Sequence, residues 1–125
     1  MRSMLRSLVA LGLLVMPAAA AHATTVLTTA PTFMPGSGTI IFCIANNLDA
    51  KDREITVEIV NTAGTVIATG SGTTPPGQTR SAQSNNLFAS YCRITFSGSR
   101  KNVRGAMTLG ANVSPFVPQI TLEAR

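Results

Sequence analysis

The chain has 125 residues and a formal charge of +5, and only 12% of its residues are charged. A chain of this length forms one domain and leaves no room for two. Its ten basic residues are far from the dense Lys/Arg surface of a nucleic-acid-binding protein, so we expect no nucleic acid partner.

The first 23 residues have the pattern of a secretory signal peptide. Arg2 and Arg6 form a positive segment, residues 8–16 (LVALGLLVM) form an apolar run, and residues 21–23 (AHA) form a small-x-small cleavage sequence. The apolar run is shorter than the ~20 residues that a membrane-spanning helix needs. We therefore expect cleavage after Ala23, export to the periplasm or out of the cell, and no membrane span in the processed protein.

The remaining segment, residues 24–125, is expected to be a single domain of 102 residues with a net charge of +3. It consists of short β-branched and apolar stretches separated by Gly, Pro, Asn and Asp, and no stretch keeps an apolar period of 3.6 residues. Repeated short strands with such breaks indicate an antiparallel β-sandwich or barrel. In chain order the expected strands are 24–29 (at a sheet edge), 39–45, 55–60, 66–69, 79–83, 90–96, 103–109 and 119–122.

Three connections carry turn signals. Gly64 in NTAGT (61–65) stands where a tight hairpin needs a positive φ, and Pro76-Gly77 suits the central pair of a type II turn. Residues 98–102 (GSRKN) predict a five-residue hairpin loop that pairs the strands before and after it.

Cys43 and Cys92 are the only cysteines, and in an exported chain pairing is the default. In SYCRITF (90–96), Cys92 alternates onto the same face as Ile94 and Phe96, so it points into the core. Its partner must then face inward too. We expect one disulfide between two packed sheets, in an all-β, antiparallel two-sheet sandwich.

The placing of the two cysteines resembles the inter-sheet bridge of the immunoglobulin fold, with one in the second strand and one near the penultimate strand. Two features depart from that fold. The chain has no tryptophan to pack on the bridge, and Tyr91 directly precedes Cys92, whereas a tyrosine corner needs a Tyr two residues before the cysteine. The resemblance implies an immunoglobulin-like sandwich.

The chain also resembles a group of small exported bacterial proteins of uncharacterised function. The resemblance implies export, the disulfide and the sandwich, and it implies no activity. Four stretches carry it: FCIANNL (42–48), REITVEIVNTAGTVIATG (53–70), PPGQT (75–79) and YCRITFSGSRKNVRGAMTL (91–109).

The outward face of the expected 90–109 hairpin is the most structured polar feature. Glu58 from a neighbouring strand is placed to join it. One interpretation is a surface ladder with one ion pair and an Arg–Tyr stack. The other is a docking face for an anion or an acidic glycan. The residues of this candidate binding face are Tyr91, Arg93, Arg100, Lys101 and Arg104.

A second feature is an apolar triplet on the outward face of the 39–45 strand, namely Ile40, Phe42 and Ile44. A solvated sheet face does not normally carry such residues. We expect the N-terminal segment or the tail at 116–122 to cover them. The alternative is an exposed patch for a partner or for self-association.

Acidic residues offer little for metal binding or catalysis. Asp49, Asp52 and Glu54 match no calcium-loop spacing, and the interleaved Lys51 and Arg53 indicate a solvated charged turn. No convergent carboxylate pair is evident for glycoside hydrolysis.

Nucleophilic catalysis also lacks its usual groups. The one histidine, His22, leaves with the signal peptide, and both cysteines are expected to be oxidised. Two thiolates do not complete a zinc site. We therefore expect no catalytic residues, no metal and no cofactor.

Three functional hypotheses remain, in this order. The first is a non-catalytic exported domain that binds an envelope component, a glycan or a protein partner. The second is a structural or self-assembling surface subunit that uses the apolar triplet or a free edge strand. The third is an enzyme, which would require a deep pocket with converging polar side chains.

Overall fold

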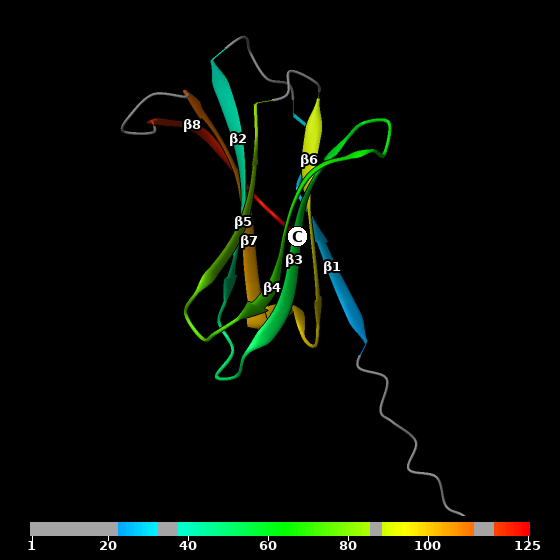
Figure 1. The fold of residues 1–125 in the computed structure, drawn as a ribbon, viewed down its shortest axis with the longest axis vertical. Helices are drawn as coiled ribbons and strands as arrows, with labels where there is room; N and C mark the ends of the chain where they lie inside the picture. The colour runs from blue at the N-terminus through cyan, green and yellow to red at the C-terminus, as the bar shows by residue number, and fades with distance from the viewer. Residues whose placement is uncertain (1–22, 33–37, 86–88, 112–116) are drawn as a thin grey trace, which may run out of the picture.

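The computed structural model describes residues 23–32, 38–85, 89–111 and 117–125, with the backbone alone at 117–119. Within these residues the chain forms eight strands and one short 3₁₀ helix (Figure 1). No helix in this part of the chain is long and apolar enough to cross a membrane. The elements are β1 (Thr24–Thr28), β2 (Thr39–Asn47), β3 (Arg53–Asn61), β4 (Val66–Thr74), β5 (Thr79–Ser84), β6 (Ser90–Ser97), η1 (Arg100–Asn102), β7 (Val103–Ala111) and β8 (Val117–Glu123).

The strands form two antiparallel four-stranded sheets that pack face to face (Figure 1). Sheet A has the order β1-β6-β3-β4, and sheet B has the order β5-β2-β7-β8. The predicted two-sheet sandwich is therefore confirmed, and β1 lies at a sheet edge as expected. The signal-peptide prediction falls on residues 1–23, of which 1–22 lie outside the described residues.

Alternation along the strands, strict in β6, builds the core between the sheets. In β6 the buried positions are Ser90, Cys92, Ile94 and Phe96, and the residues between them are partly exposed. The other strands supply the remaining inward side chains, because successive residues of a strand face opposite sides. The largest fully buried ones include Ile41, Ile55, Val57, Ile59, Met107 and Leu109.

The disulfide joins the two sheets at the centre of this core. Cys43 of β2 and Cys92 of β6 are both fully buried, and their Cα atoms are 5.7 Å apart. This separation lies within the usual range for a disulfide. The predicted inter-sheet bridge is confirmed.

One predicted pairing is wrong. Residues 98–102 are not a hairpin loop, because β6 belongs to sheet A and β7 to sheet B. Instead, η1 lies in this connection and carries the chain from one sheet to the other, and β7 pairs with β2. The inward and outward alternation of β6 and β7 is the same for either pairing, so the sequence pattern could not distinguish them.

This crossing also sets the strand order apart from the immunoglobulin constant arrangement. In that arrangement the last strand pairs with the second cysteine strand and the first strand with the first cysteine strand. Here β1 pairs with the second cysteine strand, β6, and β7 pairs with the first, β2. Relative to the immunoglobulin constant arrangement, the first and seventh strands, β1 and β7, have therefore exchanged sheets.

Both predicted glycine turns are present. Gly64 has a φ of 84°, and its N–H donates to the carbonyl of Asn61 at 2.9 Å. Gly77 has a φ of 72°, and the Gln78 N–H donates to the Pro75 carbonyl at 3.1 Å, as in a type II turn.

On one side of the sandwich, the backbones of a strand from each sheet lie in contact and join the two layers. β4 and β5 are consecutive strands in different sheets, and they run so close together that a Cβ on Gly70 would lie 1.9 Å from the carbonyl oxygen of Ser81. Only glycine fits at this contact. This is the physical reason for a glycine inside β4, where it would otherwise weaken the strand.

The other side is closed by the two residues after β8. The chain leaves sheet B at Ala124, whose N–H donates to the Gly105 carbonyl at 2.9 Å. It then reaches sheet A, where Arg125 and Thr28 exchange two backbone hydrogen bonds of 3.0 Å (Figure 1). This crossing leaves the first residues of β7 without a β8 neighbour, since the paired register ends at Ala106 and Glu123.

Candidate functional site

The structure divides the candidate binding face between two opposite sides of the sandwich. Tyr91 and Arg93 lie on the outer face of sheet A, where Arg93 Nε donates to Glu58 Oε2 at 2.7 Å. This hydrogen bond raises the pKa of the Arg93 guanidinium. The predicted ion pair is thus present, but Arg104 takes no part in it because β7 belongs to sheet B.

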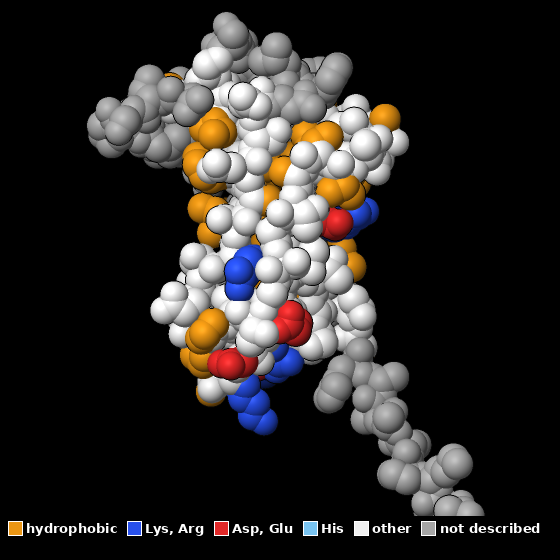
Figure 2. All heavy atoms as spheres, in the orientation of Figure 1, with side chains coloured by type: hydrophobic (Ala, Val, Ile, Leu, Met, Phe, Trp, Pro, Cys, Tyr) orange, Lys and Arg blue, Asp and Glu red, His pale blue; other side chains and the backbone are white. Residues whose placement is uncertain are grey.

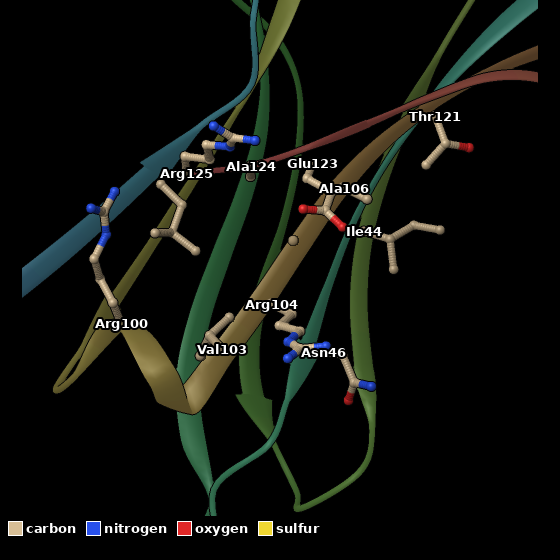
Figure 3. Close-up of a pocket in the computed structure, with 12 residues that line it drawn as sticks. Ile44, Asn46, Arg100, Val103, Arg104, Ala106, Thr121, Glu123, Ala124 and Arg125 are labelled. Carbon is tan, nitrogen blue, oxygen red and sulfur yellow. The ribbon is translucent and has the colours of Figure 1, made fainter.

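Arg100 and Arg104 do come together, in a hollow at the end of the sandwich where the chain crosses between the sheets (Figure 3). The hollow has a volume of about 810 Å³, and Arg125, from beyond β8, joins its rim. We call it the arginine notch. Lys101 is exposed beside Arg100 but does not line it. The residues that line the arginine notch include Leu27, Ile44, Asn46, Arg100, Val103, Arg104, Ala106, Thr121, Glu123 and Arg125.

The notch exists because β8 ends at Glu123, opposite Ala106, and so the first residues of β7 have no paired strand on that side. The buried Val103 and the partly exposed Gly105 form the floor of the notch, and Arg104 between them is exposed. A Cβ on Gly105 would lie 2.0 Å from Ile94 Cδ1 and 3.2 Å from Ala124 Cβ, so glycine lets the crossing segment pack against the core here. The three arginines come from η1, from β7 and from the crossing segment.

The three arginines of the notch differ from the other arginines that the structure describes. Arg53 is bound to Asp49, Arg93 is bound to Glu58, and Arg80 donates to the carbonyl of Thr73 at 2.7 Å. In the described part of the chain, Arg100, Arg104 and Arg125 make no side-chain hydrogen bond or ion pair, and all three are exposed. Their five N–H donors each remain available to a ligand.

Charged side chains gather toward this end of the molecule. Figure 2 shows most of the Lys, Arg, Asp and Glu side chains of one face in its lower half. The β2–β3 loop, the β4–β5 turn and η1 lie there in the same orientation (Figure 1). A ligand that approaches this end meets a concentration of charge that the described upper part of the same face lacks.

Hydrogen-bond acceptors also line the notch. Glu123 and Thr121 project from β8 on the same outward face as Ala106, and both are exposed. Asn46 lies opposite Arg104 on β2, and its Oδ1 is buried without a hydrogen-bond partner. A buried acceptor without a donor is unfavourable for the fold, and an oxygen with no accessible surface is out of reach of a ligand in the notch.

The apolar triplet has a graded exposure. Ile40 is 9% exposed, Phe42 is partly buried and Ile44 is 37% exposed, at the margin of the notch. The expectation that the tail covers this face is wrong for its described part, because β8 extends sheet B edge to edge with β7. Residue 116 lies outside the described residues.

The 49–53 loop is a charged turn, as expected. Asp49 pairs with Arg53, whose Nε donates to its Oδ2 at 2.7 Å, and Asn102 Nδ2 donates to the same oxygen at 3.2 Å. The hydrogen bond from Arg53 holds the pKa of Asp49 below its usual value of 3.8. The described residues contain no cluster of three or more potential metal ligands.

Sequence reasoning missed Arg125, Glu123 and Asn46. Alternation in the last strand could have placed Thr121 and Glu123 on one face, but only the crossing after β8 brings Arg125 beside η1. Comparisons of the chain with protein-family models, with curated proteins and with solved structures find no match.

Proposed function

We propose that this chain is an exported, non-catalytic recognition domain that binds an anionic component of the cell envelope at the arginine notch. One observation carries the proposal. Of the described arginines, three are held by partners within the fold, and the other three converge unpaired on one hollow. Guanidinium groups with free donors suit carboxylate or phosphate, which they bind with two parallel hydrogen bonds.

Export is supported by residues 1–23 and by the buried disulfide. The charge and length pattern of 1–23 is that of a secretory signal. Structural disulfides persist in the oxidising compartments that such a signal leads to. A protein delivered there meets the acidic polymers of the envelope.

The test compares two charge-matched double variants of the processed protein. Arg104→Ala with Arg125→Ala removes two notch arginines, whereas Arg93→Ala with Lys101→Ala removes the same charge from positions that do not line it. Each notch arginine that binds an anion contributes about tenfold to affinity. We expect the notch variant to lose at least tenfold in retention on isolated envelope, and the control variant to lose less than twofold.

Equal losses in the two variants would show that net charge alone causes retention, and the proposal would fail. Retention should also decrease with salt, since exposed ion pairs are screened. Both variants keep the backbone bonds of Arg125 to Thr28. The control variant also loses the partly exposed Arg93–Glu58 ion pair, which is worth about 1 kcal/mol or less, so both variants should stay folded.

A second candidate function is assembly into a surface structure. Ile44 on the face of sheet B is 37% exposed and Ile120 of the edge strand β8 is 49% exposed. Exposed apolar side chains can pack against a partner, and an edge strand can pair with another chain. Sedimentation of the processed protein at high concentration tests it. A monomer at all concentrations contradicts assembly and leaves the notch proposal standing.

A further inference from the structure

The arginine notch combines hydrogen-bond donors with acceptors, and this combination narrows the class of ligand. Arg100, Arg104 and Arg125 offer donors only, while the exposed Glu123 carboxylate and Thr121 hydroxyl offer acceptors. A ligand that carries acceptors alone, such as a polyphosphate, would meet repulsion at Glu123. The ligand must therefore carry donors beside its anionic groups.

The layout of the side chains gives the order of these groups. In Figure 3, Arg100 and Arg125 project on one side of β7, Arg104 and Asn46 lie on the other, and the Glu123 carboxylate lies between. A ligand that spans the notch would place one anionic group at each arginine side. The ligand groups that face Glu123 must be hydroxyls, which donate hydrogen bonds to its carboxylate, and not carboxylates.

Part of the main chain at this place is already paired. The Gly105 carbonyl already accepts from the Ala124 N–H at 2.9 Å. The Thr28 N–H and carbonyl are both occupied by Arg125 at 3.0 Å. Strand addition depends on free main-chain groups at a sheet edge, whereas the exposed guanidinium groups bind an acidic ligand through side chains.

We infer that the notch binds an acidic polysaccharide with free hydroxyl groups, that is, a chain of uronic acid units. This inference rests on the proposed function and specifies its ligand. Each unit carries one carboxylate for an arginine and hydroxyls that donate to the exposed Glu123 carboxylate. The alkyl groups of Ile44 and Ala106 line the same hollow and pack against the C–H groups of the sugar ring.

The experiment measures binding of three polyanions of matched length to the processed protein by calorimetry at low salt. The probes are oligogalacturonate, polyphosphate and a poly-glutamate peptide, with methyl-esterified oligogalacturonate as the uncharged control. We expect oligogalacturonate to bind at least about tenfold more tightly than polyphosphate, because polyphosphate has no donor for Glu123 and an unpaired acceptor costs about that factor. Poly-glutamate has N–H donors in its backbone but no sugar ring to pack on Ile44 and Ala106, so it should also bind more weakly. The esterified chain should not bind measurably.

The variant Glu123→Ala distinguishes hydrogen bonding from charge. Glu123 is exposed and forms no described contact that supports the fold. If Glu123 accepts a hydrogen bond from a sugar hydroxyl, its loss weakens the binding of oligogalacturonate. The same loss removes repulsion and therefore tightens the binding of polyphosphate.

Tighter binding of both polymers by Glu123→Ala, or equal binding of all three polyanions, would overturn the polysaccharide inference. The proposed function would survive that result as long as Arg104→Ala with Arg125→Ala abolishes binding. If that double variant instead binds every polyanion normally, both the proposed function and the inference are wrong.

Discussion

Asn47, at the end of β2, gives the sharpest test of how this fold is held together. It is fully buried, and its Nδ2 donates to the carbonyls of Lys51 and Thr74, each at 2.8 Å. Its Oδ1 accepts from the Asp49 N–H at 2.9 Å. One amide therefore ties the end of β2 to the 49–53 loop and to the end of β4.

Replacing Asn47 by Ala removes all three partners. A buried polar group left without its partner costs about 1–3 kcal/mol, and water that enters the vacated space relieves part of this. We expect a loss of about 3 kcal/mol, which is a large fraction of the 5–15 kcal/mol typical of a domain. The melting temperature should fall by roughly 12 °C or more.

Urea unfolding of the oxidised protein measures this loss, and Asn46→Ala is the matched control. Asn46 is the preceding residue on the opposite face, and its Oδ1 has no partner to lose. Its replacement should change the free energy of unfolding by less than about 0.5 kcal/mol. A loss below about 1 kcal/mol for Asn47→Ala, or equal losses for the two variants, would refute this account of the buried amide.

Two further predictions concern the bridge and the charged loop. Replacing Cys43 and Cys92 together by Ala should lower the free energy of unfolding by about 4 kcal/mol, because their separation of 49 residues closes a long loop in the unfolded chain. Urea unfolding measures this change, and a decrease of less than about 1 kcal/mol contradicts the prediction. The Asp49 pKa is lower in the folded protein than its usual 3.8, so its ion pair with Arg53 stabilises the fold above that pH and is lost as the pH falls through the folded value. Carboxyl NMR titration should give a midpoint below 3.8, and Arg53→Gln should return it toward 3.8.

Much of the local structure was predictable because it depends on neighbouring residues. The alternation of Cys92, Ile94 and Phe96 set the inward face of β6, and Gly64 and Gly77 marked their turns. The cysteines gave the inter-sheet bridge, since an inward cysteine needs an inward partner. These inferences require only the two-residue period of a strand and the positive φ that glycine allows.

The buried role of Asn47 was not predictable in the same way. In the sequence, Asn46-Asn47 indicated the end of a strand, and the two residues looked equivalent. The structure separates them, because alternation turns Asn47 inward, where the carbonyls of Lys51 and Thr74 lie within reach. Which of two adjacent amides finds partners depends on segments far along the chain.

The sequence by itself determined the strands, their inward faces, the turns and the disulfide. Only the tertiary structure decided that β7 crosses to sheet B and that Arg125 returns to sheet A. A strand shows the same alternation in either sheet, so the choice depends on which non-local edges and packing surfaces the whole chain satisfies together. That choice separates Arg93 from Arg104 and gathers the unpaired arginines of the notch.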